Sequence, residues 1–98
     1  MPTYVNLFNW TDQGIRTFRE TIDRVASAEA MLGKLDVRLK DIYWTQGVYD
    51  IVAVTEAPDE EAGTAALLAL GSQGNVRSTT LRAYTRDEMA RVIARLVV

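Results

Sequence analysis

The four residues Gly47-Val48-Tyr49-Asp50 are the part of this sequence best suited to chemistry. Glycine allows backbone conformations that other residues resist, and Tyr49 adds an aromatic ring with a hydroxyl group that needs a partner. The carboxylate of Asp50 can accept hydrogen bonds from turn amides, or from an ammonium or hydroxyl group of a ligand. Because a buried carboxylate without a partner is costly, we expect one, and Arg82 is a candidate if both side chains lie on one face of a sheet. A purely structural role of Asp50 in the turn is the alternative.

Several residues near the ends of predicted strands could line a pocket for a small polar ligand. The candidate ligand-binding residues are Asn6, Trp10, Tyr43, Trp44, Gly47, Tyr49, Asp50 and Arg82. Tryptophans at strand ends can line the mouth of a cavity, although they also serve as anchors of a core or an interface. No catalytic residue is predicted, because no catalytic signature stands out from the sequence.

The composition removes several kinds of site. The 98 residues include no cysteine and no histidine. Disulfides, thiolate chemistry and thiolate metal sites are therefore excluded, and the commonest general base, the commonest metal ligand and the imidazole ligand of haem are missing. The acidic run Asp59-Glu60-Glu61 is typical of the start of a helix rather than of a metal site. We predict no cofactor and no metal.

The charge and hydropathy of the chain limit its partners. A formal net charge of −2 leaves no basic stripe for nucleic acid and gives no reason to expect an anionic membrane surface. No run approaches the roughly 20 apolar residues of a membrane span, and the first residues lack a basic region followed by an apolar core. We expect a cytoplasmic protein with a single domain over residues 1–98.

Periodicity predicts four strands and three helices. Strands are predicted at residues 4–10, 37–43, 48–55 and 76–84, with a turn at residues 44–47. The longest helix is predicted over about Gly14 to Leu32, because apolar residues recur there every three or four positions, with Thr11 as its cap. Asp59 is predicted to cap a second helix, and a capping box that begins at Thr85 precedes a short amphipathic C-terminal helix.

The order strand, helix, strand, strand, helix, strand predicts an α+β fold of the ferredoxin-like type, followed by the final helix. Right-handed crossovers place the first and third strands in the centre of the sheet. Two helices cover one face, and the other face is bare and carries either Tyr4, Phe8 and Trp10 or Val5 and Leu7. Because neither set belongs in water, we expect two copies to pair their sheets as an isologous homodimer or a higher homo-oligomer, in the manner of a dimeric α+β barrel.

These motifs resemble the GYD domain family, whose naming tetrad is present as Gly47-Val48-Tyr49-Asp50. Further similar segments are residues 9–14, 56–59, 70–77 and 80–85. The resemblance covers nearly the whole chain and implies a small α+β protein without pointing to an activity. A weaker similarity links the tetrad and residues 76–80 to the effector-binding domain of the leucine-responsive/asparagine-operon regulators. It implies amino-acid binding between paired subunits but no transcriptional control, because no DNA-binding helix-turn-helix precedes the similar region.

Three hypotheses about function follow. The one we favour is an oligomeric, non-catalytic module that binds or senses a small molecule such as a polar metabolite. The second is a cofactor-independent enzyme of the monooxygenase or isomerase type on a dimeric α+β barrel, with a buried Asp50 as its base. The third is a purely structural oligomerisation domain. The space between Trp10, Tyr43, Asp50 and Arg82 distinguishes them, since it can be empty, wet or packed.

Overall fold

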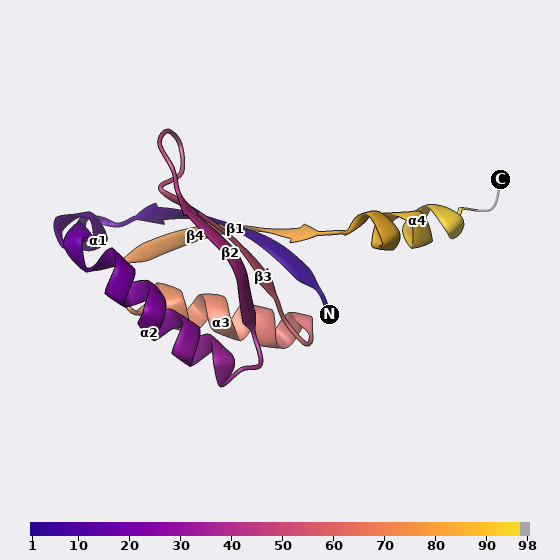
Figure 1. Cartoon of the computed structure of the whole chain (residues 1–98), viewed down its shortest axis with the longest axis horizontal. Coiled ribbons are helices and arrows are strands. Elements are labelled where there is room, and N and C mark those ends of the chain that lie inside the picture. The colour runs from indigo at the N-terminus through magenta and orange to yellow at the C-terminus, as the bar shows by residue number, and fades with distance from the viewer. Residues whose placement is uncertain (97–98) are drawn as a thin grey trace.

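The computed structural model describes residues 1–96, so that Val97 and Val98 of the predicted domain lie outside the described residues. Figure 1 shows a four-stranded sheet with helices along one face and a last helix beyond its end. The elements are β1 (Thr3–Trp10), α1 (Asp12–Arg16), the 3₁₀ helix η1 (Phe18–Glu20), α2 (Thr21–Gly33), β2 (Arg38–Trp44), β3 (Ile51–Glu56), α3 (Glu60–Ser72), β4 (Val76–Ala83) and α4 (Arg86–Ala94). None of the helices within residues 1–96 has the length and apolar character needed to cross a bilayer.

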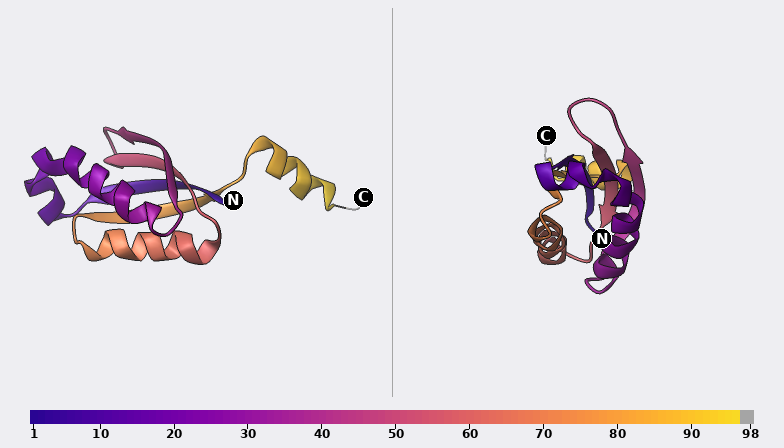
Figure 2. Two further views of the ribbon diagram at one scale, coloured as in Figure 1. Left: turned by 60° about the horizontal axis from the view of Figure 1, so that its bottom comes forward. Right: turned by 90° about the vertical axis from the view of Figure 1, so that its left-hand side faces the viewer.

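The sheet confirms the predicted ferredoxin-like α+β topology. Its strand order is β2-β3-β1-β4 and all neighbours run antiparallel, so that β1 and β3 lie in the centre. Helices α2 and α3 pack against the same face of the sheet, α2 along β2 and α3 along β4 (Figure 2). Among the described residues, no helix covers the opposite face (Figure 1).

The strand register decides which side chains of β1 face the helices. Tyr4, Asn6, Phe8 and Trp10 point toward α2 and α3, where large rings can fill the space between a sheet and its helices. The other side chains of β1 lie on the uncovered side, which we call the open face. The open face comprises Val5 and Leu7 of β1, Val52 and Val54 of β3, Leu81 of β4 and Tyr43 of β2. Of the two sets that the sequence left as alternatives, the aliphatic set is therefore the uncovered one.

The prediction of one helix from Gly14 to Leu32 is wrong, because the chain breaks after α1. Thr17 leaves the helical conformation with φ −111° and ψ 34°. The guanidinium group of Arg24 donates to the carbonyl oxygens of Gly14 (3.1 Å) and Thr17 (2.8 Å), and so ties the break to the next helix. The break turns several large apolar side chains toward solvent. Those about half exposed or more are Ile15, Phe18 and Ile22.

The β2–β3 connection is longer than predicted. The third strand begins at Ile51 rather than at Val48, and Val48 is 81% exposed at the tip of the loop. Gly47 adopts a φ of 104°, which a residue with a side chain rarely takes, and a backbone hydrogen bond from Thr45 to Asp50 of 2.8 Å closes the loop. Residues 48–50, which were predicted to begin the third strand, thus belong to the loop instead.

The predicted helix caps are confirmed. The side chain of Thr11 accepts a hydrogen bond from the amide of Gly14, and that of Asp59 accepts one from Ala62. Thr85 forms the complete capping box of α4. Beyond this cap α4 extends away from the sheet, past the N-terminal end of β1, and lies apart from α2 and α3 in Figure 1 and in the left view of Figure 2.

Candidate functional site

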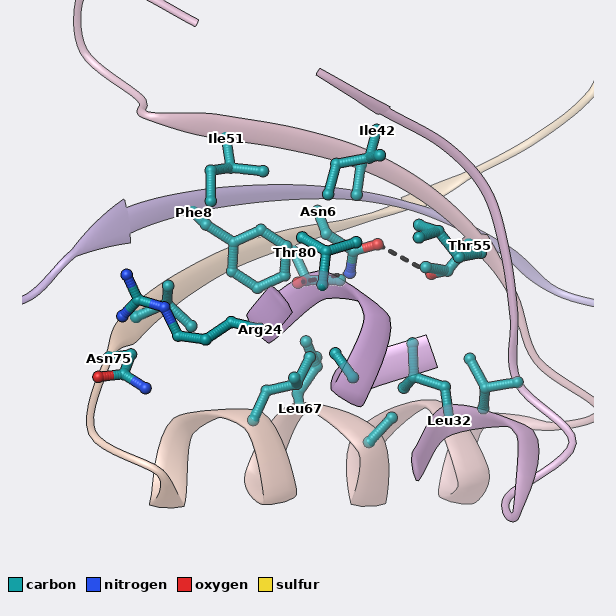
Figure 3. A pocket seen from close by; sticks show the side chains of 18 of the residues that line it. Asn6, Phe8, Arg24, Leu32, Ile42, Ile51, Thr55, Leu67, Asn75 and Thr80 are labelled. Carbon is teal, nitrogen blue, oxygen red and sulfur yellow. Dashed lines mark hydrogen bonds between the residues drawn. The ribbon is translucent and has the colours of Figure 1, made fainter. Parts of the chain in front are cut away.

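A cavity of about 110 Å³ lies between the sheet and helices α2 and α3 (Figure 3). It separates two clusters of buried apolar residues, one around Leu32 and Ala66 and the other around Phe8 and Ile51. Its walls are almost entirely apolar, because both helices turn their aliphatic faces inward. Apolar residues that line it include Phe8, Val25, Leu32, Ile51, Ala66 and Leu67.

The sheet side of the cavity carries one buried polar group. Asn6 is 4% exposed, and its side-chain amide is held by the two neighbouring strands. Its Nδ2 donates to Thr80 Oγ1 of β4 at 3.0 Å, and its Oδ1 accepts from Thr55 Oγ1 of β3 at 2.8 Å (Figure 3). Because each amide atom has a partner, Asn6 can be buried without a large penalty and its orientation is fixed.

One end of the cavity is formed by Arg24 of α2, beside Asn75 (Figure 3). Its Nη2 is engaged by the carbonyl oxygens of Gly14 and Thr17. Its Nη1 is buried and finds no hydrogen-bond acceptor within residues 1–96. A buried donor on a charged group is costly when it has no partner, so this atom is suited to bind an acceptor from a ligand.

The same end of the cavity is built by two chain segments far apart in sequence. The amide of Thr11 donates to the carbonyl oxygen of Asn75 at 3.1 Å, and Gln13 Nε2 donates to Asn75 Oδ1 at 2.9 Å. A Cβ atom at Gly14 would lie 2.0 Å from the carbonyl oxygen of Asn75, so glycine is required for this close approach. The segments 9–14 and 70–77, both part of the resemblance to the GYD domain family, therefore meet at the position of Arg24.

Asp50 has the structural role that the sequence left as an alternative. Its Oδ2 accepts a hydrogen bond from the amide of Trp10 at 2.9 Å, and its own amide donates to the carbonyl oxygen of Phe8 at 2.9 Å. It thus ties the β2–β3 loop to the end of β1, and it is not among the described residues that line the cavity. The enzyme hypothesis needed Asp50 at a cavity wall, where it could act as a base.

Four other candidates lie around the β2–β3 hairpin and outside the cavity. Tyr43 is 62% exposed on the open face. The indole Nε1 of Trp44 donates to Thr21 Oγ1 at 2.9 Å, which joins β2 to the start of α2. Gly47 and Tyr49 belong to the loop, where the carbonyl oxygen of Tyr49 accepts from the hydroxyl of Thr45. Of the eight candidates, the cavity brings together Asn6 and Trp10.

Arg82 lies at the opposite end of β1 from Asp50, so the expected convergence of these two side chains is absent. The guanidinium group is 4.5 Å from the ring centroid of Tyr84 and 5.9 Å from that of Tyr4. It also forms an ion pair of 3.7 Å with Glu88 at the start of α4. Arg82 therefore connects β4 with the start of α4, and it is not among the described residues that line the cavity.

Arg24 is the site residue that the sequence analysis missed. The apolar positions that predicted the long helix did not include Arg24, whereas α2 begins at Thr21 and places Arg24 on the cavity with Val25 and Leu32. The positions that line the cavity, Thr21, Arg24, Val25, Ala28 and Leu32, follow helical spacing from that start. An arginine among small and aliphatic residues of one helical face was the available signal, and it could be recognised only with the break at Thr17 known.

The sheet and its two covering helices define a small α+β domain with an apolar cavity between them. The family model for the GYD domain matches residues 4–93, and the chain belongs to the GYD domain family. A relative from Thermus thermophilus, named "Glutamine synthetase and cystathionine beta-lyase binding protein", is 36% identical over 97 residues and covers 98% of this chain and 99% of its own. A crystal structure of a Thermus thermophilus protein is similar with a TM-score of 0.53 and 25% identity, over 88% of this chain and 100% of that one. The resemblance drawn from the tetrad and the surrounding motifs is thereby confirmed.

Proposed function

We propose that this protein is a non-catalytic binding module whose cavity holds a small apolar molecule with a carboxylate or similar acceptor group. The observation that carries the proposal is the buried Nη1 of Arg24 at one end of an apolar cavity. A carboxylate at that atom would form a charge-assisted hydrogen bond, and the carbon skeleton would extend toward Phe8 and Leu67.

The volume of the cavity limits the ligand to a few carbon atoms. Sites for drug-sized ligands occupy about 300–1,000 Å³. An apolar cavity of about 150 Å³ holds benzene, and the cavity here is smaller, at about 110 Å³. The alkyl group of a short branched acid is smaller than benzene and fits this space between the sheet and α3, with the carboxylate at Arg24.

The ligand proposal can be tested with a matched acid and alcohol. Isovalerate and isoamyl alcohol share one carbon skeleton, and calorimetry and thermal shift report the binding of each. We expect isovalerate to stabilise the protein. Arg24→Met should weaken isovalerate binding at least about tenfold, because the charged hydrogen bond is lost. The same substitution should change the binding of the alcohol little. Arg16→Met, on the exposed side of α1, is the control.

Two results would contradict the proposal. One is that neither the acid, nor the alcohol, nor any of a panel of amino acids raises the melting temperature. The other is that Arg24→Met and Arg16→Met bind isovalerate equally well, since the acid would then not depend on Arg24.

Binding of a partner protein is a second candidate function, supported by the name of the Thermus relative. The exposed apolar side chains at the helix break, Phe18 and Ile22 among them, provide a surface for it. Sedimentation with purified glutamine synthetase and cystathionine β-lyase tests this candidate. We expect the protein to comigrate with one of the two enzymes. Phe18→Ser should abolish this comigration, and Arg16→Met should preserve it. If the unmodified protein migrates separately from both enzymes, partner binding is contradicted.

A further inference from the structure

The C-terminal arm, which we define as residues 84–96, is the part of the chain with the least contact to the rest. It carries α4 beyond the end of the sheet, on the far side of the N-terminus from α2 (Figures 1 and 2). The longest dimension of the molecule is 54 Å and its radius of gyration is 14.9 Å. A compact chain of this length has a radius of gyration of about 12.6 Å.

The junction of the arm with the sheet is held by specific hydrogen bonds and an ion pair. Thr85 Oγ1 accepts from the amide of Glu88 at 3.2 Å, and the amide of Thr85 donates to Glu88 Oε1 at 2.9 Å. Arg82 stacks on Tyr84 and pairs with Glu88, and its Nη1 donates to the carbonyl oxygen of Thr3 on β1. These contacts direct α4 away from its own sheet, and covering that sheet with α4 would require a reversal at Tyr84 and Thr85 that breaks them.

Helix α4 needs a surface to pack on. It has 9 residues, and isolated helices of fewer than about 12–15 residues are marginal in water. Its apolar side chains form one stripe at helical spacing, which is the pattern of a helix that packs against another surface. The stripe comprises Met89, Val92, Ile93 and Leu96, which are 42–69% exposed.

The same chain contains an apolar surface without a cover, the open face of the sheet. Its centre is aliphatic, Asp41 lies at its β2 side beside Tyr43, and Arg77 lies at its β4 side. Arg91 of α4 and Arg95, its C-cap residue, lie outside the apolar stripe, so a helix laid across the open face with these residues toward β2 can bring opposite charges together.

The exposed area of the chain supports a second copy as the occupant. A compact monomer of this mass, 10.9 kDa, exposes about 5,600 Å². This chain exposes 6931 Å², roughly 1,300 Å² more. A standard interface buries about 800 Å² on each partner, so the excess is enough for a stable dimer.

We propose that two copies of this chain exchange their arms, with α4 of each copy packed across the open face of the other. Every copy supplies one stripe and one open face, so a two-fold dimer pairs both surfaces twice and closes. The cavity lies on the opposite side of the sheet, and the exchange is therefore independent of the ligand proposed above. It differs from direct stacking of two sheets, which would leave α4 without a surface.

Sedimentation of single and mixed variants tests the exchange. We expect the unmodified protein to be a dimer at micromolar concentration. Ile93→Glu on the stripe and Leu81→Glu on the open face should each weaken the dimer at least about tenfold, because each places a charge against an apolar surface. Ala94→Glu, the adjacent position off the stripe, should leave the dimer intact.

Mixing the two variants separates arm exchange from sheet stacking. The mixture of Ile93→Glu with Leu81→Glu can form a heterodimer that has one unaltered stripe on one unaltered open face, so we expect it to dimerise better than either variant alone. Sheet stacking predicts no effect of Ile93→Glu and no recovery on mixing. A monomeric unmodified protein, or a dimer that Ile93→Glu leaves unchanged, overturns the proposal.

A disulfide provides a second measurement, since the sequence has no cysteine of its own. Disulfides form only where the Cα atoms approach within about 7 Å. In a chain that carries both Ile93→Cys and Leu81→Cys, oxidation should yield covalent dimers. A crosslink confined to single chains would show that the arm folds back on its own sheet. If no disulfide forms under oxidising conditions, positions 81 and 93 do not meet. Either result overturns the exchange.

Discussion

The two faces of the sheet differ in kind although alternate residues of the same strands build them. On the helix side, aromatic rings surround Asn6, whose amide is fixed by Thr55 and Thr80, and a cavity is left between sheet and helices. On the open face the centre is aliphatic and has no buried polar group. The comparison shows how one strand can serve two kinds of contact. A fixed polar group beside a cavity suits a small molecule, whereas a plain apolar surface suits a large one.

The largest difference between the faces should appear when asparagine is shortened on each. Asn6→Ala removes both hydrogen bonds of the buried amide and enlarges the cavity, so we expect the free energy of unfolding to fall by about 2–4 kcal/mol. Asn9→Ala is the matched change on the open face near the end of β1, where Nδ2 donates to the carbonyl oxygen of Val48 in an exposed setting. We expect a loss under about 1 kcal/mol there. Urea denaturation measures both values, and equal losses would remove the distinction between the faces.

A smaller effect is expected from filling the cavity. Ala66 is 4% exposed and lines the cavity, so Ala66→Leu should occupy it, abolish isovalerate binding and raise the free energy of unfolding by about 1 kcal/mol. Ala65→Leu adds the same atoms on the exposed side of α3 and should change neither quantity. Calorimetry and thermal denaturation measure the two effects. Isovalerate binding that survives in Ala66→Leu would place its site elsewhere and weaken the account of the helix-covered face.

The smallest effect concerns acid and the arm. The hydrogen bond from the backbone amide of Thr85 lowers the pKa of Glu88, and the positive charges of Arg82 and Arg91 act in the same direction. Because the pKa is lower in the folded state, the ionised carboxylate stabilises the start of α4 above the ordinary glutamate pKa of about 4.3. This contribution is lost as the pH falls through the folded value. We expect the dimer to weaken as the pH falls below the ordinary glutamate pKa, by a step that Glu88→Gln removes; an identical acid profile in that variant would contradict the role of Glu88.

The element order and the caps could be predicted from the sequence because they depend on local chemistry. Thr11, Asp59 and Thr85 begin helices for reasons contained in a few neighbouring residues. The break at Thr17 could not be predicted, since it is stabilised from the next helix, where Arg24 donates to the carbonyl oxygens of Gly14 and Thr17. The third strand was placed too early for a similar reason. Apolar and aromatic residues at Val48 and Tyr49 suggest a strand, and the long-range bonds of Asp50 decide where the loop ends.

The candidate site was predicted in part. Asn6 and Trp10 were recognised from their place on the first strand, and both line the cavity. The hairpin candidates were chosen on the expectation that the tetrad approaches a pocket, but the tetrad closes a loop at the end of the sheet. Arg24 was missed because its role depends on the break at Thr17 and on the close contact between Gly14, whose carbonyl oxygen it binds, and Asn75. Such contacts are not encoded in the spacing of residues along the chain.

The central position of β1 has a consequence for how the protein is made. Strand β1 is hydrogen-bonded to β3 on one side and to β4 on the other, although nearly the whole chain separates β1 from β4. During synthesis one edge of β1 therefore stays unpaired until Ala83 has left the ribosome, and unpaired strand edges associate readily with other chains. Closing so distant a pair is also slow, so we expect the formation of the β1–β4 ladder to limit the folding rate.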